Sequence, residues 1–499
     1  MPGKHLVVVG GSDAGIAAAL RARQLDPGWD VTVFVADAFP NFSICGIPYY
    51  LSGEVGHWRN LAHRSTTDLE ATGMVLRLDT RAIDIDTAGR RLVVRGPDGA
   101  ANEVPYDVLV LGTGAVSARP PIPGLTGPAA LGPGDGVHLL HSMGDSLAVA
   151  ESISTRRPAT AVIIGAGYIG LEMAEALTAL GIRVTQIEAL PEVLPTVDTH
   201  LGRLVRTELE THGVRVHTST TVTGISRQSS GALDVHATGP GGPLTRTVDL
   251  VLVVVGVRPD TALAAAAGAR LGAHGAIAVD EEMRTTLPGI FAAGDCVTTD
   301  HRMLGPGSWL PLGTTAHKQG RVAGENAIGG HRVFAGSLGT QVVKVFDVVA
   351  ARTGLRDAEA SSAGRGWQPV TVTTAADDHK AYYPGATPIT LAVTGDRTTG
   401  RLLGAQLIGR RGAEIAKRVD TFAAALFTEM SVDQISDLDL AYTPPLGSPW
   451  DAVQVATQTW TATHRTAPTR PPDPDRASPP PAATTRSAEP VADAGPPLN

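Results

Sequence analysis

A single cysteine stands in a segment whose residue types suit sulfur redox chemistry. Residues 41–50 read NFSICGIPYY, and Cys45 precedes the positions where a helix is expected to begin, Gly46 and Ile47. A thiolate can exchange with a disulfide or react with a peroxide, and the positive end of a helix would lower the pKa of the thiol. Cys45 is therefore the candidate nucleophile.

Two glycine-rich turns, each between an expected strand and an expected helix, suit the binding of dinucleotides. Residues 5–20 read HLVVVGGSDAGIAAAL, with Ser12 where the usual fingerprint has its middle glycine, between Gly10 and Gly15. Residues 161–176 read AVIIGAGYIGLEMAEA and carry the full GxGxxG spacing, at Gly165, Gly167 and Gly170. Such turns let backbone N–H groups approach a pyrophosphate at a helix N-terminus, so two of them predict two nucleotide sites.

A carboxylate after the second strand of each unit would accept hydrogen bonds from the ribose hydroxyls. The first such strand, 31–35, is followed two residues later by Asp37. The second, 184–187, is followed directly by Glu188. Because a carboxylate there would repel a 2′-phosphate, Glu188 favours NADH over NADPH.

Two further segments carry a family resemblance. Residues 106–115, YDVLVLGTGA, and 289–296, GIFAAGDC, resemble the ATG-type and GD-type motifs of the FAD/NAD-linked disulfide reductase superfamily. The resemblance implies that the first turn holds FAD, that the second holds the nicotinamide cofactor, and that Asp295 contacts the ribityl chain. The cofactor-binding residues expected on this basis are Gly10, Ser12, Gly15, Asp37, Thr113, Gly114, Gly165, Gly167, Gly170, Glu172, Glu188, Gly256, Gly294 and Asp295.

The cysteine pattern narrows the resemblance to one branch of that superfamily. Two-cysteine members carry CxxxxC, whereas the position five after Cys45 is Tyr50. The only other thiol, Cys296, is expected to be a small buried residue. CGIPYY thus resembles the single-cysteine branch, which includes coenzyme A disulfide reductases, NADH oxidases, NADH peroxidases and persulfide reductases. Without a resolving thiol, Cys45 must complete its redox cycle with an external thiol or an oxygen species.

The resemblance also implies a C-terminal dimerisation domain that contributes tyrosines to the partner subunit's cysteine. Residues 379–385, HKAYYPG, and 440–445, LAYTPP, match two such segments. Tyr442 is the best match for a proton donor to a leaving thiolate, and Tyr382 and Tyr383 are not separable from the sequence. Glu172 is placed near the nicotinamide by the same resemblance.

Several positions depart from the branch patterns, so the acceptor stays open at this point. Asp13 stands where oxidases and peroxidases carry a histidine, and Ile44 stands where the coenzyme A enzymes carry an asparagine before the cysteine. Gln24 and Trp450 replace an expected arginine and lysine. Arg21 and Arg23 remain as candidate phosphate ligands on the first helix.

Composition excludes several other classes of protein. The 499 residues include only two cysteines, too few for a disulfide-dense scaffold, a four-thiolate zinc site or an iron–sulfur cluster. The 15 histidines show no zinc-binding spacing, so we expect no metal. A net charge of −8 argues against a nucleic-acid partner. No apolar run is long enough to span a membrane, and we expect a cytoplasmic protein.

We therefore expect an α/β protein with two Rossmann-like dinucleotide-binding domains of glutathione-reductase-like arrangement, an α+β dimerisation domain and a disordered Pro-rich tail. The expected boundaries are 1–113 and 258–332 for FAD, 114–257 for NAD(P)H, 333–460 for dimerisation and 461–499 for the tail.

The expected function is transfer of electrons from NADH, through FAD and Cys45, to a small disulfide resembling coenzyme A disulfide, in a homodimer. Two other functions stay open from the sequence. One is an NADH oxidase that cycles through a Cys45 sulfenate. The other is a redox-responsive flavoprotein with a binding or signalling role.

Overall fold

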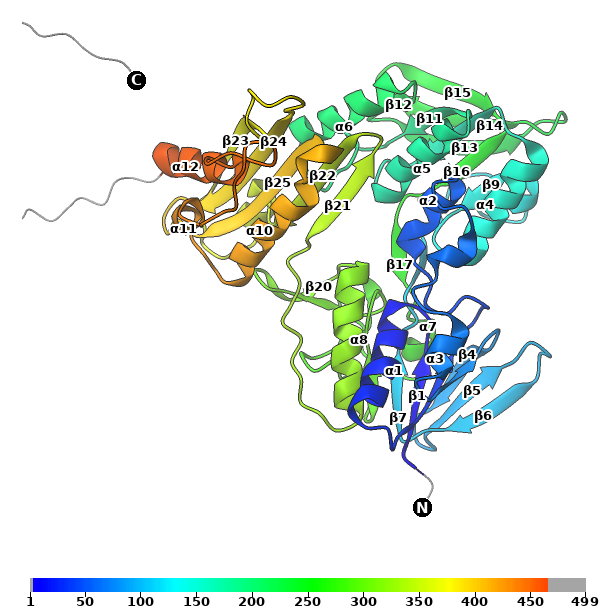
Figure 1. The fold of residues 1–499 in the computed structure, drawn as a ribbon. Coiled ribbons are helices and arrows are strands. Elements are labelled where there is room, and N and C mark those ends of the chain that lie inside the picture. The colour runs from blue at the N-terminus through cyan, green and yellow to red at the C-terminus, as the bar shows by residue number, and fades with distance from the viewer. Residues whose placement is uncertain (1–2, 465–499) are drawn as a thin grey trace, which may run out of the picture.

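The computed structural model describes residues 3–464, which form three domains (Figure 1). The first domain is built on a parallel five-stranded sheet in the order β18-β7-β1-β2-β3. Apolar runs such as that of β1 form its buried centre, since both faces of a parallel sheet are covered. Its strands are β1 (His5–Val9), β2 (Asp30–Phe34), β3 (Met74–Arg77), β7 (Val108–Leu111) and β18 (Ile290–Ala292).

Two long helices, α1 (Asp13–Leu25) and α8 (Gly313–Ala327), pack closely against each other in this domain (Figure 1). A Cβ atom at Gly320 would lie 2.2 Å from the carbonyl oxygen of Ala14, and one at Gly324 would lie 2.2 Å from that of Ala18. Small residues on both helices therefore set their separation. Smaller elements surround them: α3 (Thr66–Glu70), α7 (Ala262–Ala266), the sheet of β4 (Arg81–Asp86), β5 (Arg91–Arg95) and β6 (Ala101–Pro105), and the hairpin of β19 (Thr299–His301) and β20 (Gly305–Ser308).

The second domain repeats the architecture of the first, with a parallel sheet in the order β12-β11-β10-β16-β9. These strands are β9 (Val137–Leu139), β10 (Thr160–Ile164), β11 (Arg183–Ile187), β12 (Arg215–His217) and β16 (Leu250–Val253). The helices are α4 (Met143–Arg156), α5 (Tyr168–Ala179) and α6 (Thr199–Thr211). An antiparallel sheet of β13 (Thr221–Arg227), β14 (Leu233–Gly239) and β15 (Gly242–Val248) is inserted before β16.

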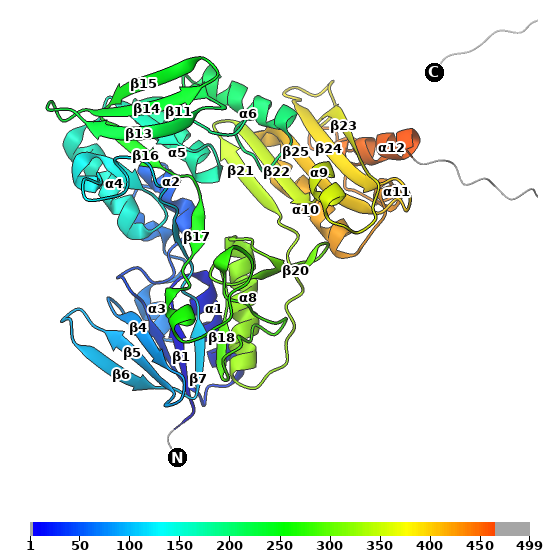
Figure 2. The same cartoon turned by 180° about the vertical axis from the view of Figure 1, so that it is seen from behind.

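The chain passes between these two domains twice, at neighbouring places. Strand β8 (Ala115–Ser117) leads out of the first domain, and β17 (Val257–Pro259) leads back, paired antiparallel to β8 (Figure 2). The short helix α2 (Ile47–Leu51) belongs to the first domain in sequence but packs against the second. Ile47 and Leu51 share one core cluster with Leu171 of α5.

The third domain is an antiparallel sheet in the order β21-β22-β25-β24-β23, with helices packed on it (Figure 1). Its elements are β21 (Gln341–Val345), β22 (Val348–Gly354), β23 (Pro369–Asp377), β24 (Pro388–Asp396), β25 (Leu402–Arg410), α9 (Asp357–Ser362), α10 (Ile415–Phe427), α11 (Val432–Ser436) and α12 (Ala452–His464). Trp460 and Phe422 are fully buried in its core.

The predicted fold class, two dinucleotide-binding units followed by an α+β domain, is confirmed. One boundary is wrong: the tail was expected from residue 461, but α12 continues to His464 because Trp460 anchors it in the core. The rest of the expected tail lies outside the described residues. Within residues 3–464, no helix is long and apolar enough to cross a membrane.

Candidate redox and dinucleotide site

The first glycine turn is shaped by close backbone approaches. Gly10 has a φ of +114°, and a Cβ there would lie 2.0 Å from the carbonyl oxygen of Gly112. A Cβ at Gly15 would lie 2.0 Å from the carbonyl oxygen of Gly10. The turn can therefore form only with glycine at both positions. Ser12, the N-cap of α1, is exposed and makes no capping hydrogen bond, so its hydroxyl is free for a ligand.

The Cys45 loop is fastened to this turn by its backbone. The amide of Asn41 donates to the carbonyl of Gly11 at 2.6 Å, and the amide of Ser43 donates to Leu61 at 2.8 Å. Asn41 has a φ of 59°, a left-handed conformation that asparagine tolerates. Cys45 then lies in a one-turn 3₁₀ helix, 44–46, directly before α2, with its side chain exposed. The loop thus places the thiol beside the turn expected to hold FAD.

The electrostatic surroundings of Cys45 differ from expectation. Desolvation by the neighbouring protein raises the pKa of Cys45, and Glu172, Asp13 and Asp295 raise it further. The prediction that a helix N-terminus lowers the pKa of Cys45 is therefore wrong for the protein without bound cofactors. Helix α2 has only five residues, so its dipole is weak, while desolvation and the three carboxylates all favour the neutral thiol. The sequence motif did not reveal that these acids converge on one sulfur.

Asp13 and Asp295 are themselves perturbed. Desolvation raises the pKa of Asp13, while His63 and His317 act in the opposite direction. Desolvation and then the charge of Asp13 raise the pKa of Asp295 to about 6. The Oδ1 atom of Asp295 is buried and has no hydrogen-bond partner among residues 3–464. A hydroxyl-bearing ligand such as the ribityl chain of FAD would supply the missing donor, so this carboxylate fits the flavin.

Glu172 lies at the start of α5, on the side of the second domain that meets α2. The hydroxyl of Tyr49 donates to Oε1 of Glu172 at 3.1 Å. Desolvation raises the pKa of Glu172 to about 7, while the Tyr49 hydrogen bond acts to lower it. A carboxyl group with this pKa can hold or release a proton near neutral pH.

A second group of charges borders the Tyr49–Glu172 pair and was not expected from the sequence. Lys344, on β21 of the third domain, pairs with Glu175 and lies 3.7 Å from a carboxylate oxygen of Glu54. Its Nζ atom lies 5.5 Å from the centre of the Tyr49 ring. Three domains therefore contribute to this region. The sequence places Tyr49 four residues after Cys45 but carries no signal for its contacts with Glu172 and Lys344.

The second glycine turn repeats the geometry of the first and leaves room for a ligand. A Cβ at Gly170 would lie 2.3 Å from the carbonyl oxygen of Gly165, whereas a Cβ at Gly167 would meet nothing within 4 Å. Glu188 is buried beside this turn. Its Oε2 accepts the amide of Ala166 at 2.7 Å, and its Oε1 accepts that of Leu190 at 2.9 Å. The carboxylate is thereby oriented, and each oxygen keeps a lone pair for a ribose hydroxyl.

The remaining residues expected at the cofactors lie around the two sheets. The Thr113 hydroxyl donates to the carbonyl of Asp260 at 2.5 Å, and no atom would meet a Cβ at Gly114 or Gly256 within 4 Å. These three residues lie next to β8 and β17, where the chain passes between the first and second domains. Gly294 instead packs against Ala14 of α1. Asp37 is exposed after β2 and accepts the amide of Phe39 at 2.9 Å. Cys296 is fully buried, as expected.

The two arginines of α1 that were candidate phosphate ligands make ion pairs or hydrogen bonds within the protein. Arg21 pairs with Glu325 at 2.7 Å. The guanidinium of Arg23 donates to the carbonyls of Thr72, Pro27 and Trp29. Arg23 therefore fastens the end of α1 to its surroundings, and its expected role as a phosphate ligand is not supported.

The three candidate tyrosines lie on the third domain, apart from the Cys45 loop. Tyr382 and Tyr442 are neighbours, since partial desolvation and a hydrogen bond with Tyr382 raise the pKa of Tyr442. Tyr382 is 73% exposed and Tyr442 is 43% exposed. The ring of Tyr383 instead makes a T-shaped contact with the ring of His379, with the two ring centroids 5.8 Å apart. The structure thus separates Tyr382 from Tyr383, which the sequence did not. Lys380 lies over Trp450, with its Nζ atom 4.8 Å from the ring centre.

Comparison with known proteins agrees with this geometry. The chain is 34% identical to a CoA-dependent NAD(P)H sulfur oxidoreductase of Pyrococcus abyssi over 91% of this chain and 97% of that protein. It is 28% identical to a coenzyme A disulfide reductase of Staphylococcus haemolyticus, over 91% of this chain and 98% of that one.

Among solved structures, an NAD-dependent persulfide reductase from A. fulgidus matches with a TM-score of 0.84 and 37% identity. The match covers 91% of this chain and 82% of that one. Residues 4–320 match the model of pyridine nucleotide-disulphide oxidoreductases, and residues 340–452 match the dimerisation domain of the same proteins. The chain therefore belongs to the pyridine nucleotide-disulphide oxidoreductase family, whose members use FAD and NAD(P)H.

Proposed function

We propose that the chain forms a homodimer in which Cys45 reduces a small disulfide or persulfide of the coenzyme A type at the expense of NADH. The observation that carries this proposal is the isolation of one accessible thiol beside the first dinucleotide turn. Cys45 is exposed, while Cys296 is fully buried and its sulfur lies 3.4 Å from the carbonyl oxygen of Ala293. The sulfur oxidoreductase, the coenzyme A disulfide reductase and the persulfide reductase to which the chain is similar act on the same class of substrate.

Reduction of one disulfide at Cys45 requires two electrons. FAD, held at Asp295 and the first glycine turn, would supply the two-electron chemistry that links NADH to the sulfur of Cys45. The Cys45 thiolate attacks one sulfur of the substrate disulfide, which forms a mixed disulfide and expels the other sulfur as a thiolate. Two electrons then break the mixed disulfide, which restores the Cys45 thiolate and releases a second thiolate. Each departing thiolate takes up one proton.

The protein's own groups prepare these steps. Asp295, through its unpartnered Oδ1, would hold the ribityl chain, and Gly10, Ser12 and Gly15 would border the FAD pyrophosphate. Glu172, hydrogen-bonded to Tyr49, would hold a proton beside the nicotinamide. Tyr442 of the partner subunit, with its Tyr382 neighbour, would donate a proton to the departing thiolate.

The choice between nicotinamide cofactors follows from Glu188. Its buried carboxylate is oriented by two backbone amides at the end of β11. That placement favours the two ribose hydroxyls of NADH and opposes the 2′-phosphate of NADPH.

The proposal is tested by comparing Cys45→Ser with Cys296→Ala in the FAD-loaded protein. Both variants should accept hydride from NADH, which bleaches the flavin absorbance. Cys45→Ser should lose the reduction of coenzyme A disulfide by roughly a hundredfold or more, since the nucleophile is gone. Cys296→Ala should retain it. If Cys45→Ser reduces acceptors as fast as the unchanged enzyme, the mechanism is wrong.

An assay with oxygen as the only electron acceptor distinguishes a disulfide reductase from an oxidase. Asp13 lies near Cys45 and opposes the negative charge of a sulfenate. We therefore expect NADH consumption with oxygen alone to be much slower than with coenzyme A disulfide added. Turnover below about one per second with every disulfide and persulfide offered would instead favour a redox-responsive binding protein.

A further inference from the structure

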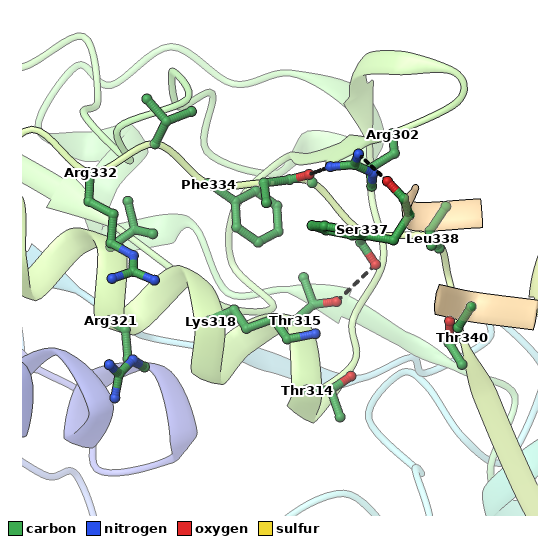
Figure 3. A pocket seen from close by; sticks show the side chains of 16 residues that line it. Arg302, Thr314, Thr315, Lys318, Arg321, Arg332, Phe334, Ser337, Leu338 and Thr340 are labelled. Atoms are coloured by element: carbon green, nitrogen blue, oxygen red, sulfur yellow. Dashed lines mark hydrogen bonds between the residues drawn. The ribbon is translucent and has the colours of Figure 1, made fainter. Parts of the chain in front are cut away.

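A basic pocket lies where the first and third domains meet, on a face of α8 that does not pack on α1. Its volume is about 390 Å³. The walls are formed by α8, by the linker 332–340 and by the end of α10, with Arg302 from the β19–β20 hairpin (Figure 3). Four cationic side chains and no carboxylate line it: Arg302, Lys318, Arg321 and Arg332.

Two of these cations differ from most charged residues of the described chain. Within residues 3–464, the side chains of Lys318 and Arg321, both on helix α8, make no hydrogen bond, ion pair or ring contact. Other arginines of this region are used structurally. Arg302 donates to the carbonyls of Ala335 and Phe427 and stacks on the Phe427 ring at 4.0 Å.

The nearest acid does not neutralise the pocket. Glu325 of α8 is held by Arg21 at 2.7 Å on the α1 side, and Arg332 reaches the same carboxylate oxygen at only 3.5 Å. The Glu325 carboxylate thus pairs with Arg21 and Arg332, and it forms no ion pair with the two free cations of the pocket. Clustered like charges in a concave site repel one another unless an anion joins them.

The uncharged lining suits a ligand with phosphate groups. Thr314 offers a hydroxyl on the first turn of α8 beside Lys318, and the hydroxyls of Thr315 and Ser337 lie 3.1 Å apart on opposite walls. Val333 and Phe427, each about half exposed, add an apolar border. Guanidinium and ammonium groups with hydroxyl donors are the usual ligands of phosphate oxygens in proteins.

We propose that this pocket binds a small molecule carrying a diphosphate or similarly charged phosphate group, with Lys318 and Arg321 as its principal contacts. The site is separate from both dinucleotide turns and does not depend on the proposed function. Because its walls come from the first and third domains, an occupying anion would hold α8 and α10 together and stabilise the domain junction.

Inorganic pyrophosphate serves as the probe. The FAD-loaded dimer is titrated calorimetrically in saturating NAD⁺, so that the second glycine turn is already occupied. We expect saturable binding that weakens with ionic strength and a rise in melting temperature. The double variant Lys318→Gln/Arg321→Gln should weaken pyrophosphate binding by roughly tenfold or more, because two charge-assisted contacts are lost.

The matched control removes two positive charges elsewhere. Arg397→Gln/Arg411→Gln, at exposed positions of the third domain, should leave the affinity unchanged. The single variant Arg321→Lys, which keeps the charge, should bind more tightly than Arg321→Gln. The proposal is overturned if both double variants weaken pyrophosphate binding equally. It is also overturned if the unchanged dimer shows no saturable binding because the partner subunit covers the pocket.

Discussion

The hydroxyl of Tyr49 donates a hydrogen bond to Oε1 of Glu172 at 3.1 Å and thereby joins helix α2, which directly follows the Cys45 turn, to helix α5, which follows the second glycine turn. The pair connects the two halves of the proposed electron path, since Tyr49 lies four residues after Cys45 and Glu172 lies two residues after Gly170. The Glu172 charge is also the leading carboxylate influence on the pKa of Cys45. Protonation at Glu172 and ionisation at Cys45 are therefore linked.

Tyr49→Phe should move the pH dependence of flavin reduction by NADH to higher pH. Desolvation holds the pKa of Glu172 at about 7, and the Tyr49 hydrogen bond lowers it, so loss of the bond raises it further. Stopped-flow flavin bleaching between pH 5.5 and 9 measures the midpoint, with these limits set about 1.5–2 units either side of the Glu172 pKa. Tyr50→Phe is the matched control and should leave the midpoint in place. A midpoint that moves to lower pH in Tyr49→Phe would contradict the assignment.

Asp13→Asn should make Cys45 more reactive at neutral pH. Desolvation and Glu172 raise the pKa of Cys45 most, and the Asp13 carboxylate adds to them, so neutralising Asp13 favours the thiolate. The rate of alkylation by iodoacetamide at pH 7 should rise by roughly three- to tenfold. Asp98→Asn, which removes an exposed carboxylate that does not act on Cys45, should not change the rate. An alkylation rate that falls in Asp13→Asn would show that Asp13 supports the thiolate instead.

Glu188→Ala should weaken the binding of NADH more than that of NADPH. The substitution removes the expected ribose acceptor and also the acceptor of the Ala166 and Leu190 amides. We expect KM for NADH to rise by roughly tenfold with kcat little changed, and the preference over NADPH to shrink. Glu210→Ala, at an exposed carboxylate on α6, controls for the change in net charge. An unchanged ratio of kcat/KM values for the two cofactors would remove Glu188 from cofactor selection.

Mixed dimers should show that Tyr442 acts across the subunit interface. A dimer of one Cys45→Ser chain and one Tyr442→Phe chain keeps one complete site only if the tyrosine serves the partner subunit's cysteine. It should retain about half of the disulfide reductase activity, whereas a Tyr442→Phe homodimer should lose roughly a hundredfold. A dimer of an unchanged chain and a Cys45→Ser/Tyr442→Phe chain should be nearly inactive. The reverse pattern would place Tyr442 beside its own cysteine, and Tyr383→Phe should have little effect in either setting.

Glu359→Gln should loosen the junction between the second and third domains. Although desolvation opposes its charge, hydrogen bonds and ion pairs with Arg352 and Arg356 lower the pKa of Glu359 to about 2. These arginines in turn donate to the carbonyls of Thr196, Pro195 and Val197. Since the carboxylate is partly exposed, we expect a loss of about 1–2 kcal/mol at pH 7.

The pH dependence of that loss follows from the direction of the shift. A carboxyl group whose pKa is lowered in the folded state stabilises the fold above its unfolded pKa, near 4.5, and loses this contribution as the pH falls toward 2. The difference in melting temperature between Glu359→Gln and the unchanged protein should therefore shrink below about pH 4.5. A difference that is constant across this range would indicate a packing effect rather than an ion pair.

Much of the fold was predictable because its signals are local. The strand–glycine–helix pattern at Gly10 and at Gly165 depends on a few neighbouring residues. A Cβ at Gly10 would lie 2.0 Å from a backbone carbonyl oxygen and one at Gly165 would lie 2.6 Å from another, so neither position accepts a side chain. That only one of the two thiols is exposed was equally predictable, because Cys296 lies in a buried turn after β18, within an apolar segment. The pKa of Cys45 was not, because the acids that act on it, Asp13, Glu172 and Asp295, are remote from one another in the chain.

The sequence by itself determined that this protein has two dinucleotide folds, because spacing and residue type are sufficient for them, and it singled out Cys45 as the one candidate thiol, which the structure shows to be exposed. Only the tertiary structure decided which polar side chains meet. Tyr49 contacts Glu172, Lys344 of the third domain pairs with Glu175, and Tyr382 rather than Tyr383 lies beside Tyr442. The basic pocket around Lys318 and Arg321 also belongs to this second group. The physical reason is that electrostatic surroundings depend on distances in space, which the packing of separate domains sets and which no local pattern records.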